Sequence, residues 1–110
     1  MKTHELKAWP HFFKEIVSGE KTCELRKDDR GYEVGDLLIL REWNPNTKEY
    51  TGHAVGAYIT HIIRINELPA DLKSAMGLNP IPGSVNMLAI LSIKLTRFRT
   101  REGFTEEASG

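Results

Sequence analysis

The sequence has little of several features that would narrow its function at once. It contains a single cysteine, which excludes an internal disulfide bond. No run approaches the roughly 20 apolar residues of a membrane-spanning helix, and the first residues do not resemble a signal peptide. Cysteine and histidine do not occur at zinc-type spacings, so we expect no metal site and no cofactor. These absences favour a cytoplasmic protein that does not contact a membrane.

The chain also lacks an excess of charge of either sign. Lysine plus arginine and aspartate plus glutamate each number 15 among the 110 residues, so the formal net charge is zero. A protein that binds nucleic acid mainly through phosphates is usually basic. Any nucleic-acid binding must therefore come from a local patch. A chain of this length forms one domain with one compact core.

Two short segments have the spacing of apolar residues that is typical of a helix. The first covers residues 10–18, with a proline in its first turn, where a missing N–H is tolerated. Gly19 follows it, and we expect a positive φ there because glycine has no Cβ to clash in a left-handed turn. The second covers residues 69–76 and is closed by Gly77.

Most of the remaining chain reads as strands separated by turn residues. Residues 79–84 contain two prolines and a glycine and are expected to be irregular. Several strands with only two short helices predict a mainly β (α+β) domain, a small barrel with closed edges, over residues 1–98. A polar tail at 99–110 is expected to fray. The expected strands are 4–8, 22–26, 37–43, one long bent strand or two over 50–65 with bends at Gly52 and Gly56, and 85–98.

The stretch at residues 19–26 carries two cations and an anion directly after the first helix. Side chains alternate along a strand, so Glu24 and Arg26 share one face and Cys23 and Leu25 share the other. We interpret Cys23 and Leu25 as core residues. The charged pair then lies on the open face of the strand.

Lys21 lies on the wrong face by strict alternation. It can join Glu24 and Arg26 only if the turn after Gly19 rotates it toward them. Two readings of such a trio are open. One is a surface ion-pair cluster worth at most about 1 kcal/mol; the other is a binding site.

The spacing G-x-K-x-x-E-x-R resembles the signature of the ASCH domain family, a branch of the PUA-like superfamily, and in particular a small, uncharacterised bacterial and phage branch. This resemblance implies a pseudo-barrel of five to six strands with two short helices at its sides. It also implies that Lys21, Glu24 and Arg26 line a cleft, and it favours the binding-site reading. Further matching positions are His4-Glu5-Leu6-Lys7, Trp9-Pro10, Phe13, Asp29-Arg30-Gly31-Tyr32 and Gly35-Asp36.

Such a cleft suits single-stranded or structured RNA, or a nucleoside-like ligand. Arg26 can grip a phosphate with two donors or stack on a base, and Lys21 can hold a phosphate or carbonyl oxygen. Glu24 can accept hydrogen bonds from an amino edge. Trp9 and Tyr32 are candidate stacking platforms at the border of the cleft.

His4 has two readings. It matches the relatives and can reach the cleft floor, or it makes a structural hydrogen bond near the start of the chain. The loop at residues 78–84 is expected to border the cleft as a lid.

Two other functions stay open. Some bacterial ASCH proteins are amidohydrolases that act on an acylated modified nucleoside, with a lysine at the position of Lys21 and a threonine at that of Glu24. If this chain is an enzyme of that kind, its catalytic set is Lys21, Glu24 and a distant Glu67. However, a carboxylate beside Lys21 favours the charged lysine and opposes its use as a base. The third function is a phage or host accessory protein that binds another protein, which would show an exposed apolar patch in place of a polar cleft.

Overall fold

The sheet formed by the described residues is mixed and curved, and it contains six strands. The computed structural model describes residues 1–77, 83–101 and 104–107, with side chains up to residue 97. The elements in chain order are β1 (Thr3–Ala8), α1 (Pro10–Ser18), β2 (Cys23–Lys27), β3 (Leu37–Asn44), β4 (Glu49–Arg64), the 3-10 helix η1 (Ile65–Glu67), α2 (Ala70–Ala75), α3 (Gly83–Asn86), β5 (Leu88–Arg101) and β6 (Phe104–Glu107). None of the helices in these described ranges is long and apolar enough to cross a membrane.

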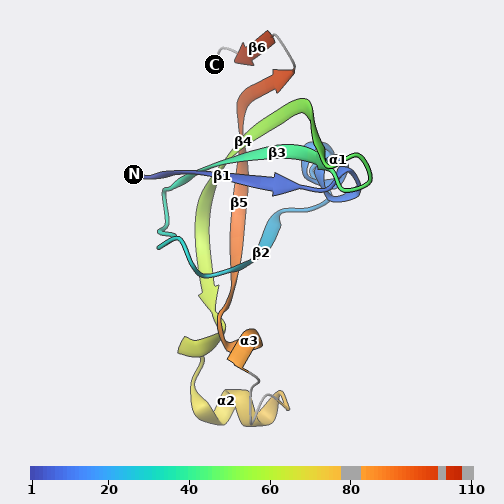
Figure 1. Cartoon of the computed structure of the whole chain (residues 1–110). Helices are drawn as coiled ribbons and strands as arrows, with labels where there is room; N and C mark the ends of the chain where they lie inside the picture. The colour runs from blue at the N-terminus through green and yellow to red at the C-terminus, as the bar shows by residue number, and fades with distance from the viewer. Residues whose placement is uncertain (78–82, 102–103, 108–110) are drawn as a thin grey trace.

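The strand order is β1-β3-β4-β5-β2, with β6 beside β5. β1 runs parallel to β3, and every other pair is antiparallel. β4 and β5 run the length of the molecule, with α2 and α3 at one end and β6 at the other (Figure 1). This arrangement confirms the predicted small, mainly β pseudo-barrel, with three short α-helices where two were expected.

Arginine side chains from β2 and from the loop after it contact β1, the strand at the other end of the strand order. Arg26 Nη2 donates to the carbonyl oxygen of Lys7 at 2.6 Å, and Arg30 Nη1 donates to that of Glu5 at 2.9 Å. Carbonyls two residues apart on a strand point to the same side. The arginines therefore satisfy two carbonyls at one edge of β1, and they bridge the two end strands, which do not pair, at what we call the β1–β2 seam.

β4 is one long strand that bends. Its register against β5 shifts between Val55 and Ala57 and again between Ile59 and His61. Gly52 has a φ of 94°. The bends expected at Gly52 and Gly56 are therefore present, because a glycine tolerates the unusual backbone of a bulge or bend.

The helices match the prediction in two places and differ in one. α1 has the predicted bounds, and α2 lies within the predicted range 69–76. The expectation of irregular structure at 79–84 is wrong for its last two residues, which begin α3, a helix that was not predicted. The strand expected from residue 85 begins only at Leu88, because residues 85 and 86 belong to α3. Both prolines of that segment precede α3, so neither interrupts its hydrogen bonds. The rest of the expected lid, residues 78–82, lies outside the described residues.

The segment expected as a polar tail takes part in the sheet. β5 runs through residue 98 to Arg101, and β6 pairs with it. Backbone pairing places 99–101 and 104–107 in strands, so the sheet continues beyond residue 98.

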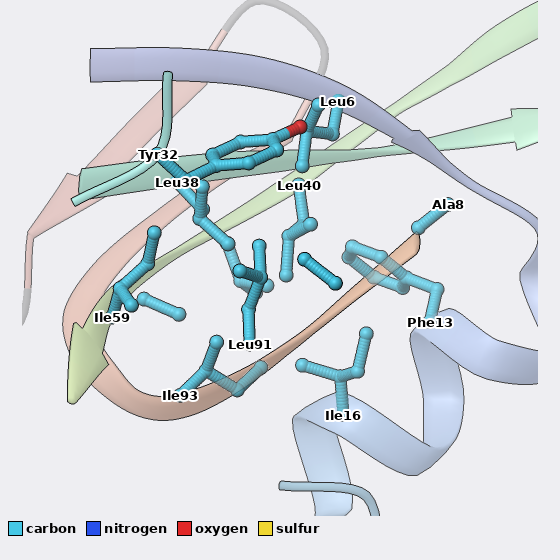
Figure 2. Packing of buried hydrophobic residues seen from close by; sticks show 13 residues of the cluster. Leu6, Ala8, Phe13, Ile16, Tyr32, Leu38, Leu40, Ile59, Leu91 and Ile93 are labelled. Carbon is cyan, nitrogen blue, oxygen red and sulfur yellow. The ribbon is translucent and has the colours of Figure 1, made fainter. Parts of the chain in front are cut away.

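The core lies between the concave face of the sheet and α1. Phe13 and Ile16 of α1 point toward Leu40 and Leu91 of the sheet (Figure 2). β1 alternates regularly, with its even-numbered side chains buried and its odd-numbered ones exposed. The buried apolar residues of this cluster are Leu6, Ala8, Phe13, Ile16, Tyr32, Leu38, Leu40, Val55, Ala57, Ile59, Ala89, Leu91 and Ile93.

α1 ends in a left-handed turn at Gly19, whose φ is 85°, as predicted. The Gly19 N–H donates to the Ile16 carbonyl at 3.1 Å, and the Lys21 N–H reaches back to the Glu15 carbonyl at 2.9 Å. These two bonds satisfy carbonyls at the helix end and set the direction in which the chain leaves it.

We expect Gly19→Ala to lower the free energy of unfolding by about 1 kcal/mol, because alanine is strained at a positive φ. A Cβ at Gly19 would meet no atom within 4 Å, so the cost comes from the backbone alone. Gly83→Ala is the control, since Gly83 is helical and also has open space around it. Thermal melting should show a lower midpoint for Gly19→Ala only. Equal midpoints for both variants would contradict the argument.

Candidate functional site

One cleft of about 510 Å³ lies beside α1, at the β1–β2 seam. The end of β1, the first turn of α1 and the strand β2 all contribute side chains to it. Of the six predicted ligand-binding residues, Trp9, Lys21, Glu24 and Arg26 line it. The full set of lining residues is Lys7, Ala8, Trp9, Phe12, Lys21, Cys23, Glu24, Leu25 and Arg26.

Glu24 lies at the centre of the charged part of this cleft, and only 5% of its side chain is exposed. Its Oε1 is 2.5 Å from Lys21 Nζ. Its Oε2 accepts from Arg26 Nε at 3.0 Å and is also 3.0 Å from Arg26 Nη2. The two cations are about a quarter exposed. A buried carboxylate is stable only when it is paired, and here each oxygen has its own cation.

Lys21 reaches Glu24 because the turn after Gly19 rotates it. Its backbone N–H is held by the Glu15 carbonyl, and the carbonyl of the next residue, Thr22, accepts from the Ile93 N–H at 2.9 Å. The chain is therefore fixed on both sides of the Lys21 side chain. Strict strand alternation does not apply at this residue, since β2 begins only at Cys23.

The prediction that Cys23 and Leu25 are core residues is wrong. Cys23 is exposed, and Leu25 is 60% exposed, while Glu24 between them is buried. Directly opposite residues of antiparallel strands share a face, and Glu24 is opposite the fully buried Leu91. The charged face of β2 therefore points inward, and this is possible because Glu24 is paired with two cations.

Aromatic and aliphatic side chains form the rest of the wall. Trp9 is 53% exposed and Phe12 is 47% exposed. Lys21 Nζ lies 5.6 Å from the centre of the Phe12 ring. Phe12 was not predicted at the site, although its position three residues after Trp9 places both on one side of the first helical turn.

His4 and Tyr32 do not line the cleft. His4 Nε2 is 2.9 Å from Asp36 Oδ2, and its ring packs edge-on against Tyr32 at 4.8 Å. Tyr32 is 1% exposed, so it offers no face to a base. Burial raises the pKa of Tyr32, against the opposing influence of Arg30 and Arg26. Of the two readings of His4, the structure shows the hydrogen bond near the chain start.

Asp36 is a buried acceptor that ties the chain start to the turn before β3. Besides His4, it accepts the backbone N–H groups of Lys2 at 2.9 Å and Glu33 at 3.0 Å. Burial raises the pKa of Asp36, but the hydrogen bonds from His4 and the two backbone amides outweigh it and hold the pKa at about 2.

The residues considered for an amidohydrolase do not come together. Lys21 and Glu24 are in contact, but Glu67 lies in η1 after β4 and does not line the cleft. η1 is at the end of the sheet near α2 and α3, away from α1 (Figure 1).

The described strands and short helices form a small half-barrel, and comparison with solved structures shows that its fold is of the ASCH type. The chain is similar to the crystal structure of ASCH from Zymomonas mobilis, with a TM-score of 0.55 and 19% sequence identity. The likeness covers 92% of this chain and 73% of that one, and at this identity it shows the fold alone.

The chain belongs to the family described as a domain of unknown function, DUF3850, whose model matches residues 3–74. This range includes every cleft-lining residue named above. The chain is also 40% identical over 70 residues to an uncharacterised 12.9 kDa protein in the GpA 3′ region of Escherichia phage P2. That match covers 64% of this chain and 62% of the phage protein.

Removing the Glu24 carboxylate should leave Lys21 and Arg26 facing each other without a counter-ion. We expect Glu24→Ala to lower the free energy of unfolding by about 1–3 kcal/mol, less than a fully buried pair because water reaches both cations. Glu5→Ala is the matched control, since it removes an exposed carboxylate that pairs with Arg41 at 3.2 Å. Urea unfolding should show a loss of about 0.5 kcal/mol or less for the control. Equal losses of unfolding free energy in the two variants would show that the Glu24 cluster stabilises the protein no more than a surface ion pair does.

Asp36 should make the protein acid-sensitive. Its pKa is lower in the folded state than in the unfolded chain, so the stability it adds is present above about pH 4 and is lost as the pH falls toward 2. A shift from 3.8 to about 2 corresponds to about 2 kcal/mol. Asp36→Asn should be less stable at pH 7, and its difference from the wild type should shrink by about that amount at pH 2. Urea unfolding at several pH values measures this difference, and a constant difference would contradict it.

Proposed function

We propose that this protein binds single-stranded RNA, or a nucleotide-like ligand, in the cleft at the β1–β2 seam. The observation that carries the proposal is the combination of side chains in one concavity. Exposed aromatic rings of Trp9 and Phe12 lie beside the cationic groups of Lys21 and Arg26. Unpaired nucleotides combine the same two features, a flat ring and a phosphate.

The rings supply surface for stacking. Stacking of a base on an aromatic side chain is worth about 1–3 kcal/mol and tolerates any base. Trp9 is held at the N-cap of α1, so its backbone is fixed while about half of its side chain stays in water. A ligand ring would bury that surface at little cost in side-chain entropy.

The charged side chains make the cleft locally positive in a neutral protein. Three of the lining residues are cationic, namely Lys7, Lys21 and Arg26. One lining residue, Glu24, is anionic, so the net charge of the cleft is two positive charges. The whole chain has a formal net charge of zero. The expected binding therefore depends on a few local contacts and only weakly on long-range attraction.

Single strands suit this cleft better than duplexes. Its volume of about 510 Å³ is within the range of pockets for one small organic molecule. Bases of a duplex are paired and stacked, so they offer no free face to Trp9 or Phe12. The similarity of the fold to an ASCH structure agrees with this proposal, since PUA-like domains include RNA-binding proteins.

A labelled uridine hexamer and a duplex of the same length test the proposal by fluorescence anisotropy. The hexamer should bind more tightly, with a salt slope of about −1.5 to −2, as expected for two or three phosphates on a single strand. Arg26→Ala should weaken binding by roughly 10-fold to 100-fold, because it removes charge-assisted hydrogen bonds. Trp9→Ala should weaken it with little change in the salt slope.

Lys73→Ala is the control, since it removes a cation from α2 at the far end of the sheet. Melting curves confirm that each variant is folded. Equal binding by the wild type and both cleft variants, or a preference for the duplex, would refute the proposal. If the wild type hydrolyses an acylated nucleoside and Lys21→Ala does not, the protein is an amidohydrolase and the binding proposal is wrong.

A further inference from the structure

We infer that the cleft recognises the phosphate of a nucleotide together with its base, and that it discriminates against the uncharged nucleoside. This inference rests on the proposed function and names the ligand class of the same site. At Lys21, Glu24 and Arg26, some hydrogen-bonding groups are already occupied and others are available to a ligand.

Glu24 offers almost no accessible acceptor to a ligand, because its carboxylate is buried and paired. Both of its oxygens are in contact with cations, Oε1 with Lys21 and Oε2 with Arg26. Only 5% of its side chain is exposed, so a ligand in the cleft has little access to the carboxylate. The amino edge of a base therefore has little access to an acceptor on this side chain.

Lys21 and Arg26 keep donors that are not used. Within the described residues, Lys21 Nζ makes one hydrogen bond, although an ammonium group has three donors. Arg26 uses Nε and Nη2 for Glu24 and the Lys7 carbonyl, while Nη1 makes no hydrogen bond to a described residue. The charged cluster thus offers donors only, two on Lys21 and two on Arg26 Nη1.

A donor-only cluster selects an acceptor-only group, and a phosphate is such a group. Its oxygens carry negative charge and accept from guanidinium and ammonium groups in short, strong hydrogen bonds. A nucleoside has hydroxyl groups that donate as well as accept, and it carries no charge. It keeps the stacking on Trp9 and Phe12 but loses the charge-assisted contacts.

Glu24 acts here as a positioning residue. It holds two cations that would otherwise repel each other, and both of these cations line the same cleft. Glu24→Gln makes the cleft more positive by one charge but removes this restraint. The variant should therefore bind phosphate less well, whereas attraction by net charge alone would make it bind more tightly.

Titration calorimetry with uridine 5′-monophosphate, uridine and inorganic phosphate tests the inference on the full chain. The monophosphate should bind roughly tenfold or more tightly than uridine, the difference expected for charge-assisted hydrogen bonds. It should also bind more tightly than inorganic phosphate, which cannot stack. Equal affinities for the monophosphate and uridine, or for the monophosphate and phosphate, would overturn the inference.

The variants separate positioning from stability. Lys21→Gln and Arg26→Gln should bring the affinity ratio of monophosphate to uridine toward one, and Lys73→Ala should leave it unchanged. Glu24→Gln should lower the ratio roughly threefold or more, whereas general destabilisation would weaken both ligands equally. An unchanged or higher ratio in Glu24→Gln would overturn its positioning role.

The two proposals fail in different ways. Tight binding of the uridine hexamer with no preference for the monophosphate over uridine would overturn the phosphate inference and leave RNA binding in place. If the protein binds neither the hexamer nor the monophosphate, both proposals are refuted.

Discussion

The site depends on one buried carboxylate that is shared by two cations. Glu24 faces the interior of the half-barrel, where an unpaired charge would be costly, and Lys21 and Arg26 each approach one of its oxygens. The same contacts fix both cations at the wall of the cleft. In the proposed function, stability and binding therefore depend on the same three side chains.

The β1–β2 seam explains why the cleft is located there. A sheet that closes completely leaves no exposed strand edge, but this sheet leaves β1 and β2 apart. Arg26 and Arg30 satisfy carbonyls of β1 across the gap. Because Arg26 contacts both the seam and Glu24, the closure of the half-barrel and the geometry of the cleft are linked. At the other end of β1, the His4–Asp36 hydrogen bond holds the strand in place.

Much of the secondary structure could be predicted from local patterns. The bounds of α1, its end at Gly19 and the bends in β4 follow from apolar spacing and from glycine positions, which act over a few residues. The face that β2 buries could not be predicted in this way. Alternation shows that Glu24 and Arg26 share a face, but Cys23 and Leu25 look equally suitable for the core. The choice depends on the pairing of Glu24, with Arg26 of the same strand and with Lys21, which the turn after Gly19 directs toward it.

The sequence by itself determined the class of fold, the turn at Gly19 and the grouping of charges at residues 19–26, because each of these depends on neighbours along the chain. Only the tertiary structure decided that Glu24 is buried and Leu25 exposed, and that Trp9 joins the cleft while Tyr32 enters the core. The physical reason is that burial is set by packing between segments distant in sequence. Whether a charged side chain can be buried depends on partners that only the folded chain supplies.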